Sequence, residues 1–327
     1  MPTHEREITE PVDLCTPDGR LDPRAVGWTR RPLHRANLRG WGRAKRWEYW
    51  GLVTPRHIVG LVASSLDYAA VHGVYVLDRG TGEEISRDGV VPFARGAVFP
   101  DRSGSGEASV RGAGFAVGVR QDPSGSRLRA LVPGVVDLDV RVPLPDGHES
   151  LGVVVPWSDR RFQYTVKDVG RPVHGRLRLP SGDHEIGDGA FAVLDHGRGK
   201  WPYRMTWNWA AASGPGLALQ LGGTWTDGTG MTENALFIGG RLHKIGDELD
   251  WSYDRGDRLR PWTIRGPRVE AEFRPFHEKV ARTELGVVGS ETHQCFGHFS
   301  GRAQADDGTW LDFDGLTGWA EEARQRW

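Results

Sequence analysis

The stretch that decides the fold class reads Ala235-Leu236-Phe237-Ile238-Gly239-Gly240-Arg241-Leu242-His243-Lys244-Ile245. Two runs of strand-forming residues flank a glycine pair, and a two-residue glycine turn is a strong short-range signal of a β-hairpin. Similar strand–turn–strand patterns occur around residues 79–82, 145–147, 181–183, 266–267 and 306–308. Consecutive hairpins form an antiparallel meander, and long meanders close into barrels because closure removes exposed edges. The sequence therefore predicts an all-β fold of antiparallel barrels.

The size of the chain favours two such barrels. It has 327 residues, with 45 glycines and 20 prolines spread along its length, which is typical of many short strands joined by turns. We expect an N-terminal arm over residues 1–40, a first barrel over 41–180 and a second over 181–327. Helical patterns are few and short, around Pro23–Trp28 and Gly318–Trp327.

Charge and composition argue against several classes of protein. The formal net charge of −1 does not suggest nucleic acid as a partner. Cys15 and Cys295 are the two cysteines, and we expect both to be reduced thiols. The polar N-terminus and the lack of any long apolar run predict a cytoplasmic protein without a membrane span. No sequence motif indicates a cofactor or a metal ion, so we expect neither. The oligomeric state is left open.

The most unusual segment is Asp195–Trp209, where three tryptophans and a tyrosine stand beside charged groups. If residues from Tyr203 onward form a strand, Tyr203, Trp207 and Trp209 point to one side. Inside a barrel, that side forms an aromatic wall with a few polar groups, which is what a small-molecule pocket needs. The alternative is a structural plug of tryptophans.

Two carboxylates are the candidate catalytic residues. Asp195 opens the aromatic segment, and Glu233 precedes the glycine hairpin. If both reach one cavity, burial raises the pKa of the drier carboxyl and makes it a proton donor near neutral pH. The alternative for Glu233 is that it only ties down a turn. The candidate ligand-binding residues are Arg198, Lys200, Trp201, Tyr203, Trp207, Asn208, Trp209, Asn234, His243, Gln294 and His298.

A basic run near the N-terminus is interleaved with tryptophans. It could contact phosphate, RNA or an anionic lipid surface, but we interpret it as a solvated arm packed on the acidic remainder. Its members are Arg30, Arg31, Arg35, Arg39, Arg43, Lys45 and Arg46, with Trp41 and Trp47 between them.

The order of these segments resembles the family called domain of unknown function 2804 (DUF2804). The resemblance rests on Arg31-Pro32-Leu33 with Asn37, Lys45–Trp50, Asp195–Tyr203, Trp207–Trp209, Thr232–Asn234, His243-Lys244, Phe273 with Pro275, Gln294 with Phe296-Gly297, and Gly318 with Glu321 or Glu322. That family in turn is similar to tandem lipocalin-like (calycin) proteins, among them the carotenoid hydratase-like and tocopherol cyclase-like group. The resemblance implies two lipocalin-like β-barrels in tandem around a buried ligand cavity.

Three functions fit these expectations. The first is an enzyme acting on an apolar, isoprenoid-like small molecule by proton-initiated hydratase, cyclase or isomerase chemistry, with Asp195 as the acid and the tryptophans stabilising a cation. The second is a carrier with the same pocket and no catalysis. The third is a carbohydrate-active hydrolase that uses Asp195 and Glu233.

Overall fold

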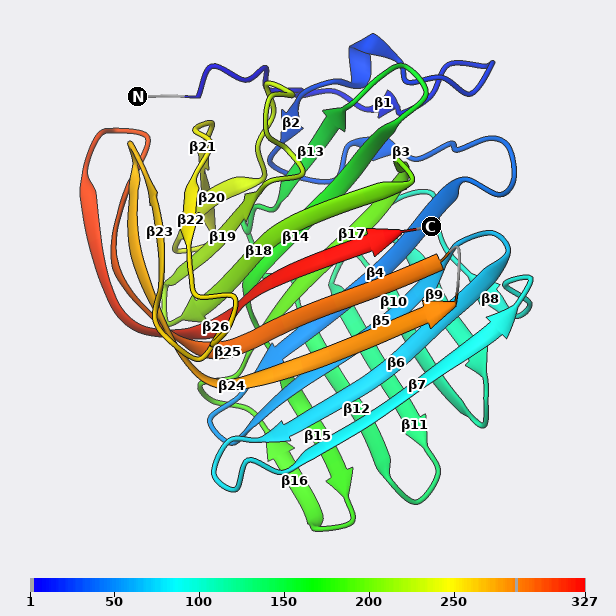
Figure 1. The fold of residues 1–327 in the computed structure, drawn as a ribbon, viewed down its shortest axis with the longest axis vertical. Coiled ribbons are helices and arrows are strands. Elements are labelled where there is room, and N and C mark those ends of the chain that lie inside the picture. Colours follow the sequence, from blue (N-terminus) through cyan, green and yellow to red (C-terminus); the bar gives the residue numbers. More distant parts are fainter. Residues whose placement is uncertain (1–2, 286–287, 327) are drawn as a thin grey trace.

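Three large antiparallel sheets carry the chain in the computed structural model, which describes residues 3–285 and 288–326 (Figure 1). The central sheet has eight strands in the order β2 (Trp28–Thr29), β13 (Leu151–Pro156), β14 (Phe162–Pro172), β17 (Phe191–Lys200), β4 (Ala44–Val53), β5 (His57–Ser65), β6 (Ala69–Asp78) and β7 (Glu84–Pro92). Its middle strands are almost continuously buried, which is typical of strands covered on both faces.

A seven-stranded sheet covers one face of the central sheet. Its order is β16 (Gly182–Ile186), β15 (His174–Leu179), β12 (Val136–Pro143), β11 (Gly125–Val132), β10 (Phe115–Asp122), β9 (Gly106–Gly112) and β8 (Ala97–Val98). Strands β10 to β12 alternate between buried and less buried positions, so one face packs and the other meets solvent. The packed face shares one hydrophobic core with β4, β5 and β6.

A nine-stranded sheet covers the opposite face. Its order is β21 (Arg241–Ile245), β20 (Asn234–Ile238), β19 (Leu217–Gly223), β18 (Arg204–Gly214), β26 (Trp310–Arg326), β25 (Val288–Gln304), β24 (Val269–Leu285), β23 (Trp262–Gly266) and β22 (Asp250–Ser252). In Figure 1 its long strands β24 to β26 bend sharply, so the sheet curls around a core of its own. Another core lies between this sheet and the central one.

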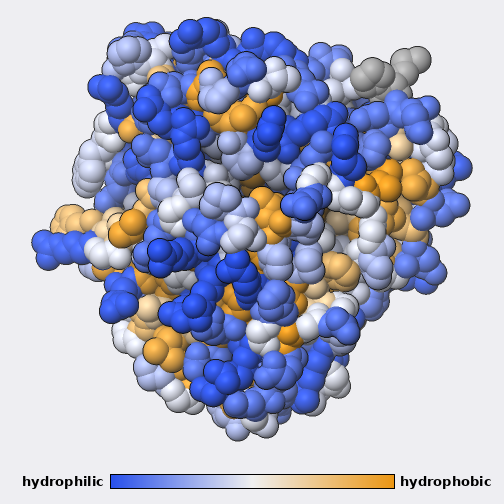
Figure 2. All heavy atoms as spheres, turned by 180° about the vertical axis from the view of Figure 1, so that it is seen from behind, coloured by the Kyte–Doolittle hydropathy of each residue, from blue (hydrophilic) through white to orange (hydrophobic). Residues whose placement is uncertain are grey.

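The N-terminal segment closes one end of the molecule. It contains the 3-10 helix η1 (Pro23–Ala25) and the parallel pair β1 (Val12–Asp13) and β3 (His34–Arg35), and it packs against β13 and β14. The face seen in Figure 2 is mainly hydrophilic, with scattered hydrophobic patches. No helix in the described part of the chain is long and apolar enough to cross a membrane.

The all-β antiparallel class predicted from the sequence is confirmed, as are five of the six hairpins. The hairpin expected across residues 145–147 is wrong. There β12 ends in the seven-stranded sheet and β13 begins in the central one, so the chain crosses between layers instead of folding back. The two strands differ in pattern, since β12 alternates whereas β13 is buried nearly throughout.

The helix expected at the C-terminus is also wrong. Its described part, from Gly318 to Arg326, belongs to β26, which pairs with β18 on one side and β25 on the other. Burial of the segment from both sides outweighs the high helix propensity of its Ala, Glu and Arg residues. The helix expected over Pro23–Trp28 is reduced to the 3-10 helix η1, and Trp28 begins β2.

The change of sheet between the two halves of the chain falls after β17, which ends at Lys200, because β18 is the first strand of the nine-stranded sheet. The division into barrels at residues 180 and 181 stays a prediction. The strands on either side of it, β15 and β16, pair with each other.

Candidate functional site

A cavity of about 230 Å³ lies between the central and nine-stranded sheets. Its walls come from strands distant in sequence, namely β4, β5, β14, β17, β18 and β26, and from the segments around Trp225 and Glu233. The lining residues are Lys45, Arg46, Trp47, Tyr49, Val62, Ser64, Leu66, Gln163, Thr165, Lys167, Asp195, Trp201, Trp207, Trp209, Trp225, Glu233, Glu321 and Gln325.

A buried lysine connects the two candidate carboxylates. Lys167 Nζ lies 3.0 Å from Asp195 Oδ1 and 3.1 Å from Glu233 Oε2. The ammonium group also lies 4.6 Å from the centroid of the Trp209 ring, within the range of a cation–π contact. The cluster of Lys167, Asp195 and Glu233 is therefore a single charged unit, which we call the lysine clamp.

The strands fix this clamp by register. Lys167 on β14 is paired with Asp195 on β17, which in turn is paired with Tyr49 on β4. Neighbouring positions in an antiparallel pair point to the same face, so these side chains meet in the cavity. Asp195 also accepts hydrogen bonds from Trp47 Nε1 and Thr165 Oγ1, each at 3.0 Å.

Burial and charge act against each other in the clamp. Burial by itself would lower the pKa of Lys167, but the carboxylates of Asp195 and Glu233 raise it, so the lysine stays charged. Burial raises the pKa of Glu233, and Lys167 opposes that shift. The Glu233 side chain is 1% exposed, and Trp225 Nε1 donates a hydrogen bond of 2.8 Å to its Oε1.

A third carboxyl group, Glu321 on β26, completes the polar part of the site. Trp207 Nε1 donates to its Oε1 at 2.9 Å, and Gln294 Nε2 donates to its Oε2 at 3.0 Å. Burial raises the pKa of Glu321 to about 7, and the Trp207 hydrogen bond only partly opposes this shift. Glu321 therefore exchanges its proton near neutral pH, as a general acid or base requires.

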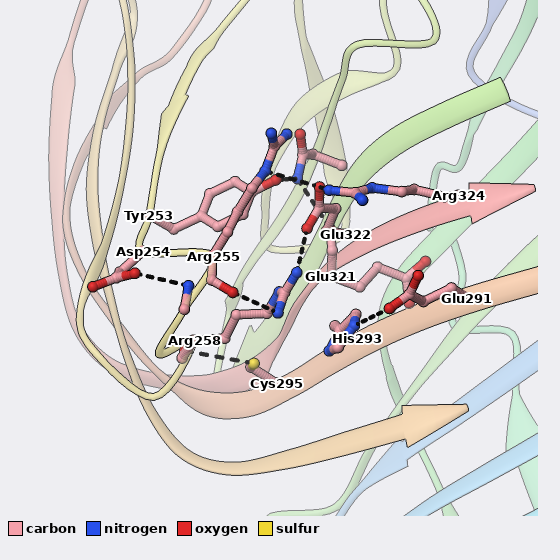
Figure 3. A network of polar contacts seen from close by, with 12 residues as sticks. Tyr253, Asp254, Arg255, Arg258, Glu291, His293, Cys295, Glu321, Glu322 and Arg324 are labelled. Atoms are coloured by element: carbon pink, nitrogen blue, oxygen red, sulfur yellow. Dashed lines mark hydrogen bonds and ion pairs between the residues drawn. The ribbon is translucent and has the colours of Figure 1, made fainter. Parts of the chain in front are cut away.

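The next residue along the strand, Glu322, has a different role. Figure 3 shows it directed toward Arg258, whereas Glu321 extends away from that arginine. Arg258 Nη2 lies 2.8 Å from Glu322 Oε2, and Arg255 and Arg324 contact Oε1 at 3.1 and 2.9 Å. These arginines keep the pKa of Glu322 below its usual value despite the opposing effect of burial.

The apolar wall is a connected group of indole rings. Trp201 contacts the rings of Trp47, Trp207 and Trp225, with centroid distances of 5.4 to 5.8 Å. Trp209 packs edge-on against Tyr49 at 5.5 Å. Tryptophan faces are electron-rich, so this wall suits an apolar ligand or one that develops positive charge.

Two glycines make room for cavity side chains. A Cβ at position 197 would overlap the ring of Trp47, the residue paired with Gly197 on β4. A Cβ at position 222 would overlap the carboxyl group of Glu233. The absence of a side chain at both positions therefore lets these groups occupy their places.

Five residues proposed from the sequence lie together in the cavity, and a sixth borders it. The lining residues are Asp195, Glu233, Trp201, Trp207 and Trp209. Gln294 reaches the cavity through its hydrogen bond to Glu321.

The other proposed residues lie elsewhere. Arg198 directly follows Gly197 on β17, so its side chain points to the face of the sheet opposite the cavity. There its Nη2 lies 3.4 Å from Glu48 Oε1. Lys200 donates to the carbonyl oxygen of Gly19 at 2.9 Å, and Tyr203 is exposed between β17 and β18. The structure does not bring these three into the cavity.

Four polar candidates in the second half of the chain also make hydrogen bonds to nearby groups outside the cavity. Asn208 donates to Tyr253 Oη, and Asn234 accepts from the backbone N–H of Gly222. His243 accepts from the backbone N–H of Asp306, and His298 contacts Thr317 Oγ1 at 3.2 Å. None of these four is among the residues that line the cavity.

Lys167 and Glu321 are two polar residues of the cavity that are absent from the candidates proposed from the sequence. Lys167 follows Gln163 and Thr165 at alternate positions of β14, with the apolar or aromatic residues Tyr164 and Val166 between them. This line of polar residues on one face is the signal in the sequence that points to Lys167. Glu321 belongs to the closing motif shared with the DUF2804 family, and nothing in the sequence near it indicates a buried acid. No group of His, Cys, Asp and Glu within residues 3–285 and 288–326 is arranged to hold a metal ion.

Comparison with solved structures identifies similar folds at low sequence identity. A provisionally assigned AttH of Nitrosomonas europaea has a TM-score of 0.56 at 12% identity, covering 86% of this chain and 92% of that one. Kievitone hydratase from Nectria haematococca has a TM-score of 0.52 at 10% identity, covering 88% and 89%. CghA has a TM-score of 0.52 at 11% identity, covering 91% and 89%. These are lipocalin-like β-barrel proteins, so the predicted fold class is confirmed.

A search of curated protein sequences finds no match. The family described as domain of unknown function (DUF2804) matches residues 5–327, which is nearly the whole chain. The chain therefore belongs to the DUF2804 family.

Proposed function

We propose that this protein binds a small apolar or amphipathic molecule in the cavity and protonates it, with Glu321 as the acid. The observation that carries the proposal is a buried carboxyl group with a pKa of about 7 beside a wall of indole rings. A cavity of about 230 Å³ is smaller than typical drug-sized pockets, which suits a ligand the size of a monoterpenoid or a substituted phenol.

The proposed chemistry is protonation of a carbon–carbon double bond. The alkene π electrons take the proton of Glu321 to form a C–H bond, which leaves a carbocation and the Glu321 carboxylate. The cation then either returns a proton to the carboxylate, which gives an isomer, or is captured by water, which gives an alcohol and a proton. One of the similar structures is a hydratase by name, which is compatible with the second outcome.

The indole rings of the apolar wall support this proposal because the faces of aromatic rings stabilise the positive charge of a carbocation. The lysine clamp supports it as well. With Asp195 ionised, the charge of Lys167 is at least cancelled, and an ionised Glu233 makes the clamp net negative. We therefore assign Asp195 and Glu233 to positioning Lys167 and balancing its charge. Asp195 accepts from three donors, which suits a carboxylate better than a proton donor.

The carbohydrate alternative has less support. Glycoside hydrolysis needs two carboxyl groups on either side of a glycosidic bond. Here Lys167 Nζ occupies the space between Asp195 and Glu233, within 3.1 Å of both.

The test is deuterium incorporation into alkenes. The purified protein is incubated in D₂O with geraniol and prenylated phenols, and mass spectrometry follows deuterium in the recovered alkene and in any hydrated product. Because the Glu321 carboxyl carries deuterium in D₂O, reversible protonation labels the alkene even without net turnover. Glu321→Gln should abolish labelling and leave binding intact, whereas the matched control Glu322→Gln should keep it. Binding without labelling would favour the carrier, and hydrolysis of aryl glycosides would favour the carbohydrate alternative.

A further inference from the structure

A second hollow, of about 410 Å³, is strongly basic and separate from the cavity. It lies between the N-terminal segment, the loop that leads into β4, the turn before β14 and the end of β17. We call it the basic groove, and its lining residues are Asp18, Gly19, Arg20, Arg39, Gly40, Trp41, Arg43, Ala44, Arg160, Arg161 and Lys200. Six of these are cationic and one is acidic, although the whole chain has a net charge of −1.

The basic run predicted to be a solvated arm divides into two parts. Some of its arginines pair with acids as expected: Arg30 with Glu7 and Glu149, Arg35 with Asp13, and Arg46 with Asp67. Arg39 and Arg43 behave differently, since no acid among the described residues pairs with either one. The expected packing on acidic residues therefore does not apply to the part of the run that lines the groove.

The other cations of the groove make few acidic contacts. Arg20 pairs with Asp18 and Asp159, at 3.0 and 2.5 Å. Lys200 and Arg161 are bound by carbonyl oxygens instead, and Arg160 has no ion-pair partner in the described chain. The groove consequently holds several charges that its own acidic residues do not neutralise.

Trp41 stands at the tip of the loop beside this groove. It is 73% exposed, the most exposed of the large hydrophobic side chains in the described chain. Gly40 and Gly42 flank it with φ of +88° and +87°, and a Cβ at either position would meet no atom within 4 Å. The loop therefore projects from the surface, and left-handed backbone on both sides of the tryptophan favours glycine there.

The base of the loop is held in place. Asp67 Oδ2 accepts from the backbone N–H groups of Gly42 and Ala44, at 2.7 and 3.0 Å. Its other oxygen accepts from Arg46 at 2.9 Å. This anchoring presents Trp41 in a defined position, with an arginine on either side.

We propose that the Arg39–Arg43 loop and the basic groove dock the protein on an anionic lipid membrane. Tryptophan is favoured at the level of lipid headgroups, and cationic side chains are attracted to anionic ones. A soluble phosphate would use the groove and leave Trp41 without a role, so the two features together favour a bilayer. This inference goes beyond the proposed function and does not depend on it.

Docking would bring the cavity close to the membrane. Lys45 and Arg46 lie one residue beyond the loop in the chain, after Ala44, and both line the cavity. An apolar ligand dissolved in the bilayer would then have a short path to the apolar wall of the cavity.

Vesicle co-sedimentation of the full chain tests the proposal. The expected result is binding to vesicles of phosphatidylcholine mixed with phosphatidylglycerol, weakening as salt is added, and no binding to phosphatidylcholine alone. The variant Arg39→Ala/Arg43→Ala should bind about 30-fold more weakly, since each arginine near an anionic surface contributes about 1 kcal/mol. Trp41→Ala should also weaken binding.

The matched control is Arg111→Ala/Arg120→Ala. It removes the same charge from exposed positions on β9 and β10, and it should bind anionic vesicles like the wild type. Unchanged melting temperatures would show that all variants fold. The proposal is overturned if the wild type ignores anionic vesicles, or if the Arg39→Ala/Arg43→Ala variant binds them as well as the control. It is also overturned if inorganic phosphate or single-stranded RNA binds the groove while the vesicles do not.

Discussion

The indole of Trp319 on β26 lies directly against Gly51 on β4, so the two sheets that enclose the cavity meet without a side chain at position 51. A Cβ there would overlap the six-membered part of the ring. Trp319 also contacts Tyr49 and Trp209, with centroid distances of 5.8 and 5.4 Å, so this contact supports the cavity wall from behind.

Gly51→Ala should therefore destabilise the protein. We expect a loss of about 1–3 kcal/mol in the free energy of unfolding, the usual range for overpacking in a core. Urea denaturation measures it. The control is Gly60→Ala. Gly60 on β5 is paired with Gly51 on β4, but a Cβ at position 60 would meet its nearest atom, Tyr49 Oη, at the ordinary contact distance of 3.5 Å. Equal stability of the two variants would contradict the close contact.

Removing the clamp lysine should be costly. Lys167→Met leaves Asp195 and Glu233 without their buried counter-charge, so a loss of about 3–5 kcal/mol in unfolding free energy is expected. Adding Glu233→Gln should recover part of the loss, because it removes one of the two unpaired charges.

The control for this prediction is Lys200→Met. It removes a lysine bound to a carbonyl oxygen instead of a buried carboxylate, and it should cost only about 1 kcal/mol. If Lys167→Met and Glu233→Gln destabilise independently and additively, the two residues do not act as one charged unit.

Glu321 should titrate near neutral pH. Its Oε1 accepts the indole N–H of Trp207, so the ¹⁵N–¹H signal of that indole should shift with a midpoint at a pH of about 7. The shift should disappear in Glu321→Gln and persist in Glu322→Gln. A midpoint below pH 5 would remove the acid that the proposed chemistry requires.

Stability should fall as the pH falls from about 6.5 to about 4. Burial lowers the pKa of His34, His57 and His196 to about 4, so in this window the unfolded chain takes up protons that the folded chain does not. Glu321 acts in the opposite direction, because its raised pKa makes the folded chain the better proton acceptor between about 4.5 and 7.

The combined effect of His34, His57 and His196 on the unfolding free energy exceeds the opposite effect of Glu321. Chemical denaturation at several pH values gives the slope of the unfolding free energy against pH. In His34→Asn this slope should be shallower by up to about 1.4 kcal/mol per pH unit. A slope that does not change in this variant would mean that His34 takes up its proton equally in both states.

Local sequence patterns were enough to predict the tight turns and part of the aromatic wall. Gly239 and Gly240 adopt the positive φ values that a tight hairpin turn needs, and Trp207 and Trp209 share a face because strand side chains alternate. Both inferences depend on residues close together in the chain, where backbone geometry alone sets the outcome.

Contacts between distant strands set which charged groups meet. Lys167, Asp195, Glu233 and Glu321 come from β14, β17, the segment before β20, and β26, and their approach depends on pairings between strands far apart in the chain. The same holds for Gly318–Arg326, whose composition favours a helix until β18 and β25 pair with it on both sides. Long-range pairing is driven by burial of both faces of a strand, and no local pattern specifies the partner that will cover each face.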